Sequence, residues 1–297
     1  MRVLYVNHTA AVSGAERSLL SLLAALPPTL EAIVAAPPGR LLELVEELGV
    51  ATTPITGTAG SLRLHPVHTP RALVEMSLAG IQVRRASRRH GAHLVHANSI
   101  RAGIALGLGR PPVATVVHVR DCLPPGPVST ATLRLIAASA TTVLANSRYT
   151  ARSVAAVAPA APLEVVHNPV DLKRFDPARI DRASARARLG RAGERAVLLG
   201  VVAQLSPWKG QDTAIEALGL LCEEEVDAHL LLVGSAKFVE RATRYDNESY
   251  VASLRARVAD AGAQARHVGL VVVAGRALDE LGRADQQQMR IDLLLAQ

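Results

Sequence analysis

Aromatic residues are scarce in this sequence, because only 2% of its 297 residues are Phe, Trp or Tyr. Proteins that bind single-stranded nucleic acid without sequence preference stack the bases on aromatic side chains, so the composition argues against that function. Hydrophobic residues still make up 49% of the chain, which is an ordinary globular share. The cores must therefore be aliphatic, and the length predicts two domains.

Cysteine and long apolar runs are also missing. The chain has two cysteines, Cys122 and Cys222, without C-x-x-C spacing, which argues against a disulfide framework or a zinc site. No apolar run reaches the length of about 18 residues that a membrane span needs. The apolar stretch at the N-terminus is too short for a secretory signal. We therefore expect a cytoplasmic protein.

The charge balance is basic, with a formal net charge of +7 and a pI of about 10.1. Such a surface attracts nucleic acid, anionic lipid or phosphorylated small molecules. The arginines are scattered and no nucleic-acid reader motif is present, so we expect no nucleic-acid partner. Residues 71–90 combine five arginines with apolar residues and predict a basic amphipathic helix. Such a helix can contact the inner face of an anionic membrane, although an ordinary surface helix shows the same pattern.

Short apolar runs alternate with helical patterns along the first half of the chain. The predicted strands cover residues 2–7, 31–36, 92–97, 113–118, 141–145 and 163–167. The predicted helices cover residues 14–26, 40–48, 70–89, 129–139 and 147–157. This order is typical of a doubly wound parallel α/β domain, which we place at residues 1–167.

Two proline-containing segments, Asn168-Pro169 and Phe175-Asp176-Pro177, interrupt the pattern and predict a linker over residues 168–180. A second α/β series follows in residues 181–297. Its predicted strands are 196–203, 229–234 and 268–274, and its predicted helices are 210–221 and 248–262. This region is short for a doubly wound domain and its last thirty or so residues lose periodicity, so we expect the second domain to be incomplete.

Three turns at predicted strand ends carry candidate site residues. The first is Ser13-Gly14-Ala15-Glu16-Arg17, where a glycine opens a helix and the helix N-terminus offers N–H groups to an anion. A tight strand–helix turn would use the same residues. The turn has no G-x-G-x-x-G pattern, so we expect no dinucleotide cofactor.

The second turn is His118-Val119-Arg120-Asp121, and Asn98-Ser99 follow His96 at the end of the preceding strand. Carboxyl ends of parallel strands meet at one edge of a sheet, where ligands bind. The third turn, Gln204 to Gly210, places Lys209 beside a helix N-terminus, and both attract a diphosphate. Structural roles for the histidine and the lysine stay open from the residues alone.

These segments, in this order, resemble the family-four retaining glycosyltransferases over roughly residues 1–265. Further matching segments are Ala145-Asn146-Ser147, Val166-His167-Asn168-Pro169-Val170-Asp171 and Val233-Gly234. The resemblance implies the GT-B fold, in which two Rossmann-like domains face each other. It also implies transfer of a sugar from a nucleotide sugar to an acceptor with retention of configuration, without a metal or other cofactor.

The resemblance assigns roles residue by residue. His118 would lie near the transferred sugar as the catalytic residue. The donor would contact Gly14, Gln204, Lys209 and Gly210. The acceptor or the cleft would be lined by Glu16, Arg17, Asn98, Ser99, Arg120 and Asp121.

Two departures from the family pattern stand out. Gln204 occupies a position where the family often has arginine, and the Glu-x-Phe-Gly-x-x-x-x-Glu segment is absent from the sequence. We therefore expect the C-terminal end, from about residue 267, to be truncated or altered, with residues 291–295 as a last strand. Two alternatives to a transferase follow: a non-catalytic nucleotide-binding relative, or a GT-B sugar-nucleotide epimerase.

Overall fold

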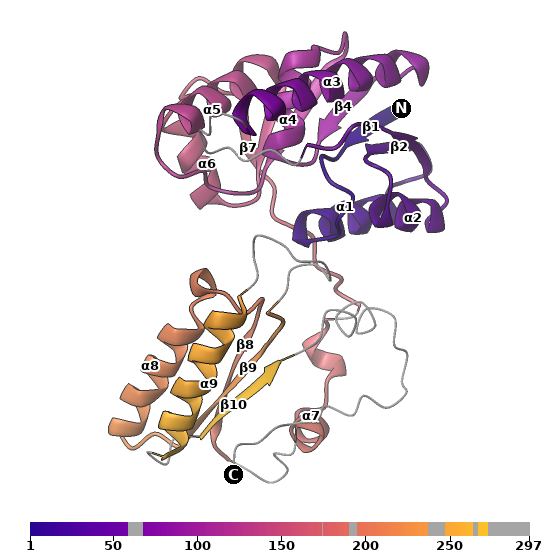
Figure 1. The fold of residues 1–297 in the computed structure, drawn as a ribbon. Helices are drawn as coiled ribbons and strands as arrows, with labels where there is room; N and C mark the ends of the chain where they lie inside the picture. Colours follow the sequence, from indigo (N-terminus) through magenta and orange to yellow (C-terminus); the bar gives the residue numbers. More distant parts are fainter. Residues whose placement is uncertain (59–67, 174, 190–194, 237–246, 264–266, 273–297) are drawn as a thin grey trace. The chain divides into compact units, whose positions relative to one another are not determined.

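The computed structural model describes residues 1–58, 68–173, 175–189, 195–236, 247–263 and 267–272 (Figure 1). The chain divides into two compact units, Met1–Asp176 and Pro177–Gln297, each with its own sheet.

The first unit contains a seven-stranded sheet in the order β3-β2-β1-β4-β5-β6-β7, and all pairings are parallel. The strands are β1 (Arg2–Val6), β2 (Glu31–Ala36), β3 (Ala51–Pro54), β4 (Leu94–Ala97), β5 (Ala114–Val119), β6 (Thr142–Ala145) and β7 (Leu163–Val165). The strand order reverses direction between β1 and β4. In open parallel sheets, ligands bind beyond the carboxyl ends of the strands at such a reversal.

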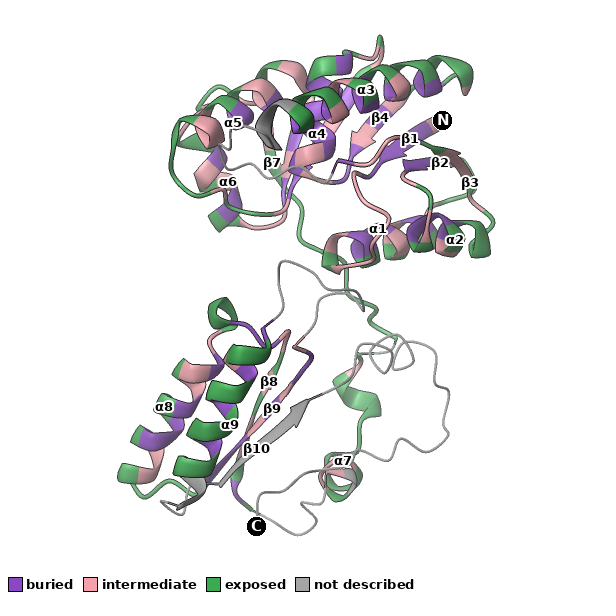
Figure 2. Ribbon diagram, in the orientation of Figure 1, coloured by how far each residue is buried: buried purple, intermediate pink, exposed green. Residues whose placement is uncertain are grey.

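Helices cover both faces of this sheet (Figure 1). They are α1 (Gly14–Ala24), α2 (Arg40–Glu47), α3 (His68–Arg89), α4 (Ile100–Gly109), α5 (Pro127–Ser139) and α6 (Arg148–Ala155). Alternate residues of a strand point to opposite faces, so β1 contributes to two cores. Val3 and Tyr5 pack with α1 and α2, whereas Leu4 and Val6 pack on the side of α3 to α6. Figure 2 shows these buried positions along the central strands.

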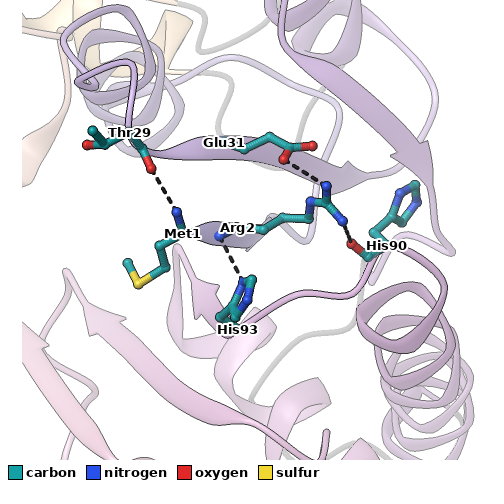
Figure 3. Close-up of polar contacts among 6 residues, drawn as sticks. All are labelled: Met1, Arg2, Thr29, Glu31, His90 and His93. Carbon is teal, nitrogen blue, oxygen red and sulfur yellow. Dashed lines mark hydrogen bonds and ion pairs between the residues drawn. The ribbon is translucent and has the colours of Figure 1, made fainter.

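At the amino edge of the sheet, polar contacts attach β1 to its neighbours (Figure 3). The Arg2 guanidinium pairs with Glu31 of β2 at 2.8 Å and donates to the carbonyl of His90 at 2.6 Å. The N–H of Arg2 donates to Nδ1 of His93 at 3.0 Å, and the Met1 ammonium donates to the carbonyl of Thr29 at 2.7 Å. These contacts leave the opposite, carboxyl edge as the place for a ligand.

The second unit contains a parallel sheet in the order β10-β9-β8. Its strands are β8 (Val197–Val202), β9 (Ala228–Gly234) and β10 (His267–Val272). Its helices are α7 (Arg182–Arg188), α8 (Gln211–Glu223) and α9 (Glu248–Ala263), with short 3-10 turns at η1 (Pro177–Arg179) and η2 (Pro207–Lys209). The aliphatic core lies between the sheet and α8 and α9, and it includes Leu205, Leu218, Leu232 and Leu254.

Every element predicted from the sequence within the described residues is present, with ends shifted by a few residues. Three further elements were not predicted: β3, α4 and α7. Regular structure continues through β10, which pairs with β9 from His267 to Val272. The predicted truncated or altered end from about residue 267 stays a prediction, because most of that segment lies outside the described residues. The predicted strand at 291–295 lies outside the described residues.

Helices α3 and α4 approach each other closely enough that their backbones touch. A Cβ on Gly109 would lie 2.2 Å from the carbonyl oxygen of Gly80, and a Cβ on Gly80 would lie 2.5 Å from the carbonyl oxygen of Ala105. Both contacts are with backbone atoms, which cannot rotate away as a side chain can. Glycine at these two positions therefore sets the distance between the helices.

We expect Gly109→Ala to lower the free energy of unfolding by about 1–3 kcal/mol, the usual cost of overpacking a core. The intrinsic helix preference of alanine would work in the opposite direction. Urea unfolding followed by circular dichroism measures the change. Gly14→Ala is the control, because a Cβ there would meet nothing within 4 Å. A Gly109→Ala protein as stable as the wild type would contradict the close packing of α3 and α4.

Candidate active site

Polar residues follow the ends of four neighbouring strands in the first unit. Asn7 follows β1, Asn98 follows β4, Arg120 follows β5 and Asn146 follows β6. Because these strands are parallel, the four residues come together at the carboxyl edge of the sheet.

Asn98 connects the strand ends to the first turn of α1. Its side-chain amide donates to Oδ1 of Asn7 at 3.1 Å and to the carbonyl of Ala15 at 3.2 Å. Asn7 in turn donates to Oε1 of Glu16 at 3.0 Å. The other carboxylate oxygen of Glu16 accepts from the N–H of Ser13 at 3.0 Å and from its hydroxyl. Glu16 and Asn98 are almost fully buried, so both act inside the protein as supports of the turn.

Arg120 is held by several donated hydrogen bonds. Its Nε donates to the carbonyl of Asn98 at 3.2 Å, and its Nη2 donates to Oδ1 of Asn98 at 2.9 Å. Nη1 of Arg120 donates to the hydroxyl of Ser18 on α1 at 3.1 Å and to Oδ1 of Asn168 at 2.6 Å. Burial lowers the pKa of Arg120, and the charges of Glu16 and Asp121 partly oppose that effect. The guanidinium thus joins the strand ends, α1 and the segment that leaves the first unit.

Asn146 extends this network toward the edge of the sheet. Its amide donates to the carbonyl of Arg120 at 2.9 Å, and its Oδ1 accepts from the hydroxyl of Thr150 at 2.9 Å. Asp121, next to Arg120, is exposed. The carboxylate of Asp121 therefore lies at the surface beside the buried network.

Tyr5, His96 and His118 form a row across β1, β4 and β5. The rings of Tyr5 and His96 are 5.3 Å apart between centroids, and those of His96 and His118 are 6.0 Å apart. Burial, with a smaller contribution from the charge of Arg120, lowers the pKa of His96 to about 4 and that of His118 to about 3. Nε2 of each histidine is buried and bonds to no residue in the part of the chain that the structure describes.

Two neutral imidazoles therefore lie beneath the carboxyl edge. A neutral imidazole can donate one hydrogen bond and accept another, but it supplies no proton as an acid near pH 7. His118, at 5% exposure, can bind a hydroxyl group that reaches its Nε2. The geometry fits it for binding rather than for proton transfer.

His8 was not predicted as a site residue, yet it contacts Ser99 and Arg101. Its Nε2 lies 3.2 Å from NH1 of Arg101, which can only donate, so Nδ1 carries the proton and donates to the Ser99 hydroxyl at 2.9 Å. Burial, then the charge of Arg101, lowers the pKa of His8 to about 4. Ser99 also caps α4 by accepting from the N–H of Ala102 at 3.2 Å.

The start of α1 is open. Gly14 is exposed and a Cβ there would meet nothing within 4 Å, so packing does not require glycine at this position. Because Gly14 has no side chain, an anion can come close to the first N–H groups of α1 and bind to them. Arg17 lies exposed in the same first turn and adds positive charge.

The second unit holds the other predicted residues in one loop at the carboxyl end of β8. Gln204 follows the strand, Lys209 ends η2, and Gly210 precedes α8 with a φ of +73°, which favours glycine. Lys209 is exposed. The buried Nε2 of Gln204 has no hydrogen-bond partner among the described residues. The loop can therefore offer the charge of Lys209 to an anion.

The structure thus places the predicted residues in two groups, one in each unit. In the first group, hydrogen bonds connect Glu16, Asn98 and Arg120. Ser99 contacts His8. Asn7, His8 and Asn146 were missed as site residues. Asn7 is the last residue of a predicted strand, and His8 and Asn146 each directly follow one, so that position was the signal that could have identified them. In the described residues, no three His, Cys, Asp or Glu side chains group as a metal site.

Solved structures share the fold of this chain. The Anabaena protein HepE in complex with UDP is similar with a TM-score of 0.67 and 23% sequence identity, covering 96% of this chain and 72% of that one. A glycosyltransferase from Rickettsia africae has a TM-score of 0.66 and 14% identity, covering 96% and 71%. These similarities confirm the predicted α/β class and its GT-B fold.

The family follows from the sequence of the first unit. The model of Glycosyltransferase Family 4 matches residues 12–174, which is more than half of the chain. The protein belongs to this family, as the resemblance of its motifs predicted.

Curated relatives match over a shorter stretch. A GDP-mannose-dependent alpha-(1-6)-phosphatidylinositol monomannoside mannosyltransferase of Mycolicibacterium smegmatis is 38% identical over 127 residues. These residues are 42% of this chain and 33% of the relative. The protein of the same name from Mycobacterium tuberculosis strain H37Rv is 35% identical over 127 residues, 42% of this chain and 32% of the relative. The match thus spans about a third of the length of these relatives.

The lowered histidine pKa values predict a loss of stability in mild acid. The pKa of His8 and His96 is about 4 and that of His118 is about 3, whereas histidines of the unfolded chain titrate near 6.5. Between these values the unfolded chain binds more protons than the folded one, so the free energy of unfolding falls as the pH drops from about 6.5 to about 4.

His96→Phe keeps an aromatic ring and removes one titrating group. As the pH falls from about 6.5 to about 4, we expect the free energy of unfolding to fall less in this variant than in the wild type. Urea unfolding at a series of pH values measures this difference. The same difference at all pH values would show that His96 is not held neutral by burial.

Proposed function

We propose that the protein transfers a hexosyl group from a nucleotide sugar to an acceptor, with retention of configuration at the anomeric carbon. The observation that carries the proposal is the family match over residues 12–174. The relatives that depend on GDP-mannose support a nucleotide sugar as the donor. The loop of Lys209 supports binding of its phosphates.

The donor diphosphate binds the ammonium of Lys209 and the N-terminal end of α8. When the bond between the anomeric carbon and the phosphate oxygen breaks, negative charge grows on the leaving nucleoside diphosphate. A fixed positive charge stabilises that growing charge without a metal ion. Gln204 stands where the family often has an arginine.

His118 binds a hydroxyl of the transferred sugar through Nε2. Because its pKa is about 3, the ring is neutral at physiological pH and too weak a base to remove the acceptor proton. In the proposed reaction the acceptor oxygen bonds to the anomeric carbon on the face that the phosphate leaves. The acceptor proton passes to an oxygen of the leaving diphosphate, so the step needs no protein base.

One observation favours a second function, nucleotide binding without transfer. The sequence lacks the Glu-x-Phe-Gly-x-x-x-x-Glu segment that the resemblance expects for the sugar and ribose sites. A binder without turnover would hold the nucleotide at the same loop. Formation of a product from a labelled donor distinguishes the two functions.

For the donor loop, we expect Lys209→Ala to weaken nucleoside diphosphate binding by about ten- to hundredfold, the usual effect of losing a hydrogen bond from a charged group. Titration calorimetry with GDP, UDP and ADP measures the affinity and identifies the base. Lys173→Ala, the same change at the other lysine of the described residues, should leave the affinity unchanged.

Transfer is measured with the labelled nucleotide sugar of the preferred base, and proton NMR of the product gives its anomeric configuration. Transfer with inversion would contradict the proposed retention. Binding without product would favour the non-catalytic function. Equal affinity in wild type and Lys209→Ala would remove Lys209 from the donor site.

We further propose that helix α3 rests on an anionic membrane surface. Its inner face packs on the sheet and on α4 through Ala72, Met76 and Val83. The outer face of its first half is apolar and exposed, at Leu73, Val74, Leu78 and Ile81. The second half of that face is basic and exposed, at Arg84, Arg85, Arg88 and Arg89.

An apolar patch next to several arginines is complementary to the hydrocarbon boundary and the anionic headgroups of a lipid surface. The lipid named as substrate of the mycobacterial relatives supports an acceptor at a membrane. None of the described helices is long and apolar enough to cross a bilayer, so the proposed contact is peripheral. We place it at the cytoplasmic face.

We expect the protein to sediment with phosphatidylcholine vesicles that contain phosphatidylglycerol, and not with vesicles of phosphatidylcholine alone. Each arginine near such a surface contributes about 1 kcal/mol to the free energy of binding. Replacing Arg88 and Arg89 by Glu should therefore weaken binding by about thirtyfold or more. Ile81→Glu should weaken it as well. Leu220→Glu changes a leucine of α8 that is even more exposed than Ile81, at 63% against 46%, and should have no effect. Binding that does not depend on the anionic lipid would contradict the proposal.

A further inference from the structure

Gln211, the first residue of α8, is a fully buried glutamine in the second unit. Glutamine is mostly an exposed residue, and a buried amide is stable only when it is hydrogen-bonded. At the start of a helix it could easily point to water. Its burial therefore requires an explanation from its partners.

Both ends of the Gln211 amide have a partner. Nε2 donates to the main-chain carbonyl of Gln204 at 2.8 Å. Oε1 accepts from the hydroxyl of Tyr250, on α9, at 3.3 Å. The side chain thus connects the end of β8 to the start of α8 and to the neighbouring helix.

The segment that this amide closes is the loop that carries Lys209. Inside the loop, the N–H of Lys209 donates to the carbonyl of Ser206 at 3.0 Å, which forms η2. The N–H of Leu205 donates to the carbonyl of Ser235, beyond β9, at 3.0 Å. Gly210 then turns the chain into α8. The contact from Gln211 to Gln204 joins the first and last parts of this loop through a side chain.

That contact adds a side-chain link between the two ends of the loop, beside the backbone hydrogen bond from Lys209 to Ser206. Lys209 is exposed, as are Pro207 and Trp208, and its backbone position follows from where the loop begins and ends. We propose that Gln211 is a positioning residue that fixes Lys209 for the donor diphosphate, a role that rests on the proposed function of Lys209. Tyr250 holds the amide of Gln211 in the orientation that this requires.

The alternative is that Gln211 only stabilises the second unit. The two roles differ in one respect: a positioning residue affects nucleotide binding through Lys209, so its effect disappears when Lys209 is absent. A double-mutant cycle measures this dependence. Gln211→Met is suitable because it keeps a side chain of similar length and removes both hydrogen bonds. Tyr250→Phe is milder, since it removes only the hydroxyl and keeps the ring.

The experiment measures the affinity of UDP and GDP by calorimetry for the wild type, Lys209→Ala, Gln211→Met and the double variant. Circular dichroism confirms that each protein is folded at the temperature used. We expect Gln211→Met to weaken binding about fivefold, which corresponds to the net value of one hydrogen bond. In the background of Lys209→Ala, the same substitution should change the affinity by less than about twofold. Tyr250→Phe should weaken binding in the same direction by a smaller factor.

Ile215→Val is the matched control, because it destabilises the same helix and leaves both hydrogen bonds of Gln211 in place. It should lower the melting temperature and leave the nucleotide affinity unchanged. Equal effects of Gln211→Met with and without Lys209 would overturn the positioning role while leaving the proposed function intact. An unchanged affinity in Lys209→Ala alone would overturn both. If Gln211→Met does not fold, the same cycle with Tyr250→Phe decides the question.

Discussion

The structure of the site depends on the need of buried polar groups for hydrogen-bond partners at the edge of a parallel sheet. Apolar strands end together there, and the first polar residue of each is still largely buried. An unpaired amide at that depth costs about 1–3 kcal/mol, so the strand ends bond to one another. Asn98 is the centre of this arrangement, because it bonds to Asn7, to the first turn of α1 and to Arg120. The positions of α1 and of the segment at Asn168 follow from it.

This constraint divides the predicted residues by role. Glu16, Asn98 and Arg120 use their polar atoms on the protein and hold the site together. Gly14, His118 and Lys209 keep a surface or an atom available for a ligand. The sequence indicates that both sets lie at strand ends. It does not reveal which atoms are already paired, since this depends on contacts between residues as far apart as Ser18 and Arg120.

The fold was largely predictable because most of its strands are continuously apolar and most of its helices have a clear period. Helix α4 was missed since Gly103, Gly107 and Gly109 weaken its helical pattern. All three pack closely: Gly109 against α3, Gly107 against α5, and Gly103 against β5 and α5. Strand β3 has only four residues and ends at Pro54, which resembles a turn. The site was predictable where a motif marked it. His8 and Gln211 carry no such mark, because their roles come from partners that only the folded chain brings close.

The central place of β1 has a consequence for synthesis of the chain on the ribosome. β1 pairs on one side with β2, which ends at Ala36, and on the other with β4, which ends at Ala97. At about 5–20 residues per second, the ribosome needs roughly 3–12 seconds to make the residues between these two ends. During that time one edge of β1 has no native strand to pair with, and an open strand edge is a template for aggregation. The same arrangement that forms the ligand-binding edge therefore makes the nascent chain a substrate for chaperones until β4 has emerged.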